Sequence, residues 1–162
     1  MTRPDELSQE HWEALLDAAP AIAIGVAAAA GSGTQTEAEL SAFVELVERS
    51  AVDADPGTLL GRLTADVHGR LAGGWLAETD DPLTDGLQAA RRAGAILAVA
   101  AEPHEADAIR GWYLEGARVV ARSTREGGVL GVGSEQVSRH EDETIKAIAD
   151  ALGEDVEPPA GP

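Results

Sequence analysis

Two glycine-rich segments of the chain each lead into acidic residues, and it is here that the sequence could do chemistry. Residues 31–39 read Gly-Ser-Gly-Thr-Gln-Thr-Glu-Ala-Glu, and residues 131–141 read Gly-Val-Gly-Ser-Glu-Gln-Val-Ser-Arg-His-Glu. Carboxylate and hydroxyl oxygens are the hard ligands that Ca²⁺ and Mg²⁺ prefer. The pattern therefore predicts a divalent cation, Ca²⁺ or Mg²⁺, at one or both segments. The candidate metal ligands are Glu37, Glu39, Glu135, Glu141, Asp142 and Glu143.

The same two segments also have a purely structural interpretation. Each contains Thr/Ser-x-x-Glu, the pattern of a capping box at a helix start. Thr36 and Ser138 would be the N-caps, and Glu39 and Glu141 would bond back to the cap amides. The two boxes lie near opposite ends of the chain, which indicates a pseudo-two-fold helical domain. In this interpretation any bound metal is additional to the caps.

Other patterns that could bind or react are incomplete. Asp53 begins an EF-hand-like stretch, but Thr58 and Thr64 stand where the loop needs glycine and glutamate. The glycines near residue 130 lack the strand and lysine of a phosphate-binding loop. The acids around His104 (Glu102, Glu105 and Asp107) suit a solvated helix start. No serine, histidine and acid form a recognisable catalytic set, so no enzyme is predicted.

Composition and net charge indicate the secondary structure and limit the kinds of partner that this protein can bind. The chain has 31 alanines but only three Trp, one Tyr and one Phe, which favours helices over strands. A net charge of −17 disfavours nucleic acid and anionic membranes as partners. There is no cysteine for a disulfide or thiolate site, and the apolar run 18–30 is too short to span a bilayer. We therefore expect a cytoplasmic protein without membrane insertion.

The spacing of hydrophobic residues, together with residues typical of helix starts and ends, predicts one all-α domain. Asp55-Pro56 and Asp81-Pro82 each combine an N-cap acid with proline at the first helical position. Gly73-Gly74 and Gly153 mark helix ends. The expected layout is a loose start at 1–6, a helical domain at 7–153 and a disordered tail at 154–162. About seven helices are predicted, over residues 8–19, 21–30, 36–52, 56–72, 82–101, 103–124 and 138–152.

In these segments the chain resembles the TerB-like family of tellurite-resistance-associated helical proteins. The similarity consists of the Ala-rich run 21–30, Ser32-Gly33, Thr36-x-x-Glu39, and the later Gly-rich run 127–133 followed by Val137-Ser138-x-x-Glu141. The resemblance implies a compact all-α domain with two loop-helix motifs, a link to chemical stress and an acidic metal-binding surface. Ser32 stands where the family usually has an aspartate, which removes one ligand from the first loop.

The expected function is thus a non-enzymatic, stress-associated TerB-like module that binds a divalent cation at its acidic helix starts. The alternative is a ligand-free scaffold that contacts a protein partner or a second copy of itself through alanine-lined grooves. A third possibility, a small hydrolase or transferase, would require a concave pocket with a perturbed acid or base beside it.

Overall fold

The computed structural model describes residues 7–29, 36–74, 79–127 and 134–153, and these form six helices with no strand. The all-α class is therefore confirmed. The helices are α1 (Gln9–Ala29), α2 (Thr36–Asp53), α3 (Leu59–Ala72), α4 (Pro82–Ala100), α5 (Pro103–Gly127) and α6 (Ser134–Leu152). The predicted loose start, the predicted tail and residues 128–133 of the Gly-rich run lie outside the described residues.

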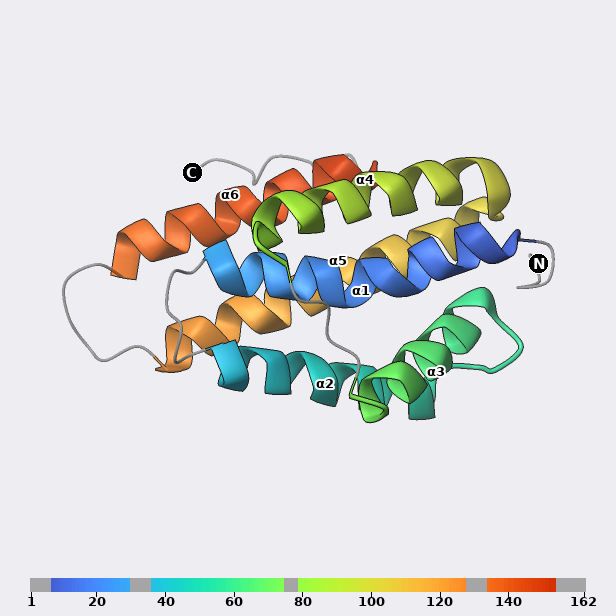
Figure 1. The fold of residues 1–162 in the computed structure, drawn as a ribbon, viewed down its shortest axis with the longest axis horizontal. Helices are drawn as coiled ribbons and strands as arrows, with labels where there is room; N and C mark the ends of the chain where they lie inside the picture. The colour runs from blue at the N-terminus through green and yellow to red at the C-terminus, as the bar shows by residue number, and fades with distance from the viewer. Residues whose placement is uncertain (1–6, 30–35, 75–78, 128–133, 154–162) are drawn as a thin grey trace.

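The helices form three layers around α1 (Figure 1). α1 and α5 make the middle layer, α4 and α6 cover one side, and α2 and α3 cover the other. α1 contacts each of the other five helices, and its most extensive contacts are with α4. Its sequence explains this central position, because leucine, isoleucine, valine and alanine on several faces of α1 are buried.

Pro20 lies inside α1, and this overturns one prediction. Residues 8–19 and 21–30 were expected to form two helices, but Gln9–Ala29 is a single helix of 21 residues. Proline removes one helical hydrogen bond and crowds the preceding turn. Here Pro20 is buried between Ala19 and Ile22, which are also buried, so packing around the helix outweighs that cost. The described residues accordingly form six helices, and the predicted count of about seven is not confirmed.

The length of α1 also changes the membrane argument. In the part of the chain that the structure describes, α1 alone is long and apolar enough to cross a bilayer, judged by length and composition. The apolar run 18–30 alone is too short to span a bilayer. Most of this run belongs to α1, however, and that helix begins earlier, at Gln9, so the helix as a whole is long enough. In the fold, 61% of the candidate stretch is buried. The core helix of a globular domain has the same properties.

The two predicted Asp-Pro helix starts behave differently. At α4 the prediction is confirmed, since Asp81 Oδ1 accepts a hydrogen bond from Thr84 N at 3.3 Å and Pro82 begins the helix. At α3 it is wrong, because the N-cap is Thr58, whose Oγ1 accepts from Gly61 N at 3.0 Å. Asp55 instead forms the preceding turn and accepts from Gly57 N at 2.8 Å.

Three glycines in helices allow backbones to approach closely. A Cβ on Gly25 of α1 would lie 2.9 Å from Pro82 O, and one on Gly86 of α4 would lie 2.8 Å from Ala21 O. A Cβ on Gly94 would lie 2.7 Å from Leu152 O at the end of α6. The absence of side chains at these three glycines therefore lets α4 pack closely against both α1 and α6.

Candidate functional site

The predicted metal ligands lie in the first turn of α2 and along the first half of α6. Glu37 and Glu39 lie in the first turn of α2, which begins at Thr36. Their side chains, and those of Glu135 and Glu141 in α6, lie outside the described residues. The predicted capping roles of Thr36 and Glu39 fall on side chains outside the described residues. Asp142 and Glu143 are exposed on α6.

The second predicted capping box is wrong. α6 begins at Ser134, so Ser138 and Glu141 lie inside the helix and Ser138 is not its N-cap. The helix starts one turn earlier because nothing in Glu135-Gln136-Val137 opposes helix formation. Glu141 is then not a capping residue, and its replacement by glutamine is not expected to remove a cap.

The helical geometry of α6 also separates the candidate ligands. Consecutive helical residues point about 100° apart, so Asp142 and Glu143 diverge. Glu143 lies near His140 instead, with 3.9 Å between Oε2 and Nδ1. Among the side chains that the structure describes, no group of three or more His, Asp or Glu residues could hold one metal ion.

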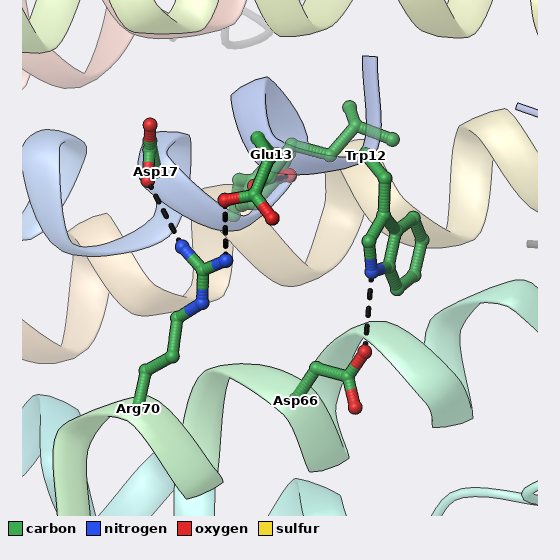
Figure 2. A network of polar contacts seen from close by, with 7 residues as sticks. Trp12, Glu13, Asp17, Asp66 and Arg70 are labelled. Carbon is green, nitrogen blue, oxygen red and sulfur yellow. Dashed lines mark hydrogen bonds and ion pairs between the residues drawn. The ribbon is translucent and has the colours of Figure 1, made fainter. Parts of the chain in front are cut away.

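A polar network between α1 and α3 was not predicted. Arg70 of α3 contacts two carboxylates of α1: its Nη1 lies 3.3 Å from Asp17 Oδ1, and its Nη2 bonds to Glu13 (Figure 2). In the same network the indole N–H of Trp12 donates to Asp66 Oδ2 at 3.1 Å. The only sequence signal for it is the spacing of acids on α1 at residues 10, 13 and 17, which places them on one stripe.

This stripe, which we call the acidic stripe (Glu10, Glu13 and Asp17), is contacted from two sides. Arg70 reaches it from α3, and Arg92 reaches it from α4, with 2.8 Å between Nη2 and Glu10 Oε1. Burial raises the pKa of Asp17 and outweighs the opposing effect of Arg70; Glu13 raises the pKa further and Arg92 lowers it. The acidic stripe thus joins three helices, although its carboxylates repel one another.

We expect the stability of Asp17→Asn, measured relative to that of the wild type, to be greater at neutral than at acidic pH. A carboxyl whose pKa is raised by folding supplies stability below its unfolded pKa, and that stability is lost as pH rises through the folded pKa. Asparagine does not titrate, so the free energy of unfolding of the variant minus that of the wild type should increase from about pH 3 to about pH 6. Urea unfolding across this range measures it.

Asp150→Asn, which removes an exposed carboxylate paired with Lys146, is the control for the loss of one charge. A difference that decreases with pH for Asp17→Asn would contradict the prediction, because it would mean that the attraction of Arg70 exceeds the cost of burial.

Buried polar groups in the described residues are all bonded within the fold. The buried polar and charged side chains there are Thr64, Glu105 and Thr144. Thr64 Oγ1 donates to Gly61 O at 3.0 Å, and Thr144 Oγ1 donates to His140 O at 2.8 Å. Each of these bonds satisfies a hydroxyl that would otherwise be costly to bury.

Glu105 corrects another expectation. It was predicted to belong to a solvated helix start, but it is buried, and its Oε1 accepts a hydrogen bond from Leu59 N at 3.4 Å. Leu59 is the first residue of α3, whose early amides have no partner within the helix. Glu105 of α5 therefore helps to cap α3 across the interface.

The aromatic side chains of α5 also join helices. The Tyr113 hydroxyl donates to Leu15 O at 2.7 Å, and Trp112 Nε1 donates to Ser50 Oγ at 3.0 Å. Burial raises the pKa of Tyr113 far above its usual value, so the phenol stays neutral. These contacts account for the two rings as parts of the core.

Comparison of the chain with known protein families, curated proteins and solved structures finds no match. In the described part of the chain, the hydrogen bonds of Glu105, Trp112 and Tyr113 link different helices. Thr64 and Thr144 bond to carbonyls of their own helices, and Glu105 is the one acidic side chain that is buried there.

Proposed function

We propose that this chain is a non-enzymatic, cytoplasmic module of the TerB-like type, which acts in a stress response through its acidic surface. Its ligand in this proposal is a divalent cation bound weakly by the acidic residues of α6 or by Glu37 and Glu39 at the start of α2. The observation that carries the non-enzymatic part is the role of the buried polar groups: Thr64, Glu105, Thr144, Trp112 and Tyr113 are all hydrogen-bonded between or within helices.

The TerB-like assignment rests on sequence motifs together with the fold class. The Ala-rich run 21–30, the Gly-containing turn and Thr36-x-x-Glu39 occur in the family's order, and the all-helical fold agrees with it. The cation is supported by the net charge of −17 and by the carboxylates in the first half of α6. Hard, exposed carboxylates suit Ca²⁺ or Mg²⁺ better than a softer metal.

A ligand-free scaffold is the second candidate, and one observation favours it. Asp142 and Glu143 diverge along α6, and Glu143 lies near His140, so this pair does not present both carboxylates to one ion. In that case the acidic surface would contact a basic region of a partner protein or a second copy of the chain, with charge setting the rate of encounter.

Calorimetric titration distinguishes the two candidates. Ca²⁺, Mg²⁺ and Zn²⁺ are titrated into chelator-treated protein at about 0.15 M salt, where diffuse charge is screened over roughly 8 Å. A cation site on α6 expects saturable binding of Ca²⁺ or Mg²⁺ that is lost in Glu141→Gln/Asp142→Asn, whereas a site on α2 expects saturable binding that survives in this variant. The matched control is Glu45→Gln/Glu48→Gln, which removes two exposed carboxylates from α2 and should leave binding intact.

Equal loss of heat in both double variants would mean that the ions only screen the surface charge, and it would contradict a site at α6. No saturable heat with any of the three metals would favour the scaffold, and the oligomeric state would then be measured.

A further inference from the structure

We propose that Arg70 is an ionic latch that holds the last turn of α3 closed against α1. Arg70 lies in that last turn, and its guanidinium contacts Glu13 and Asp17, one turn apart on α1 (Figure 2). The inference concerns a conformational device and goes beyond the proposed function, because it holds whether or not the protein binds a cation.

Apart from Arg70, the last turn of α3 has one apolar side chain that helps to hold it, the half-buried Leu71, which packs against the core. The buried residues of α3 are Leu59, Gly61, Leu63, Thr64 and Val67. After Val67, residues 68, 70 and 71 are half-buried, and Gly69 and Ala72 are exposed. Gly69 lies within this turn, Gly73 and Gly74 end it, and glycine is a poor helix former. The first two turns of α3 are thus held by fully buried side chains, whereas the last is held by the half-buried Leu71 and by the ion pairs of Arg70.

The contacts of Arg70 are open to screening by salt. The exposed fractions of the side chains are 29% for Arg70, 44% for Glu13 and 55% for Asp17. Attraction between such partly exposed charges falls as the Debye length shrinks, from about 30 Å at 0.01 M salt to about 3 Å at 1 M. Apolar contacts of Leu63 and Val67 do not weaken in this way. Salt should therefore open the last turn as a local unit while the rest of α3 stays packed.

Opening of the latch would change the surface of α1. Arg70 withdraws from Glu13 and Asp17, whereas Glu10 keeps its contact with Arg92 of α4. Two carboxylates of the acidic stripe then face solvent without their guanidinium. Any cationic group that competes with Arg70 for them shifts the last turn of α3 toward the open state.

Residue-resolved amide hydrogen exchange by NMR tests the latch. We expect protection of the amides of residues 70–74 to fall about two- to tenfold when NaCl is raised from about 0.02 M to about 0.5 M. The amides of Leu63 and Val67 should not change. Arg70→Gln should show low protection of the last turn at both salt concentrations. Arg92→Gln, which removes the same charge from α4, is the matched control and should keep the salt response of the wild type.

Three results would overturn the proposal. One is salt-independent protection of residues 70–74 in the wild type, which needs no variant to fold. Another is unchanged protection of this turn in Arg70→Gln at low salt. The third is a parallel loss of protection at Leu63 and Val67, because α3 would then open as a whole and the last turn would not be a separate latch.

Discussion

Replacing Gly94 with alanine is expected to lower the free energy of unfolding by about 1–3 kcal/mol, although alanine is the better helix former. The added Cβ would lie 2.7 Å from Leu152 O, 2.8 Å from Leu152 C and 2.9 Å from Ala151 O. These are backbone atoms of the last turn of α6, which cannot rotate away as a flexible side chain can. Urea unfolding followed by circular dichroism measures the loss.

Gly111→Ala on α5 is the matched control for this substitution. A Cβ at Gly111 meets nothing within 4 Å, so only the gain in helix propensity remains. Its free energy of unfolding should rise by up to about 1 kcal/mol. If Gly94→Ala were as stable as Gly111→Ala, α4 and α6 would be able to separate without cost, and the close approach of these helices would not be required by the fold.

The second large effect is expected at Leu63 of α3. Its side chain is fully buried, and truncation to alanine should cost about 2–5 kcal/mol, from lost burial and the cavity left behind. Val99→Ala on α4 is the control, because Val99 is 83% exposed and its change should stay within about 0.5 kcal/mol. The measurement is again chemical unfolding of the two variants against the wild type.

The Leu63 result also separates two descriptions of α3. A large loss in a single cooperative transition means that the first turns of α3 belong to the common core, as the latch requires. A loss below about 1 kcal/mol would contradict the prediction and would mean that α3 is only loosely attached along its whole length.

The helical class and several boundaries could be predicted because their causes are local. Asp81 and Pro82 are adjacent and satisfy the start of α4 by themselves. Gly153, with φ +80°, ends α6 because it adopts a backbone conformation that other residues rarely accept. The prediction that Pro20 separates two helices was wrong because burial of Pro20 in the core offsets the free energy that proline costs inside a helix. That burial depends on helices distant in sequence, so it cannot be predicted from the residues next to Pro20.

The error at the start of α3 is local, whereas the errors at Arg70 and Glu105 come from partners that are distant in sequence. Asp55-Pro56 has the pattern of a helix start, yet Gly61 allows the backbone of Asp55 to fold closely over α3, and Thr58 becomes the cap. The partners of Arg70 lie 53 and 57 residues away, so only the spacing of the acids on α1 was visible beforehand. Glu105 became buried because its partner is the start of another helix.

The central place of α1 has a consequence for synthesis. It is the first of the described helices to leave the ribosome, whereas α4, its main partner, is complete only at Ala100. At about 5–20 residues per second, α1 waits roughly 4–14 s for that partner. During this interval an apolar helix of 21 residues lacks the α4 face that later covers it. By length and composition this stretch has the properties of a membrane segment, so the apolar face of α1 is open to other apolar surfaces until α4 is made.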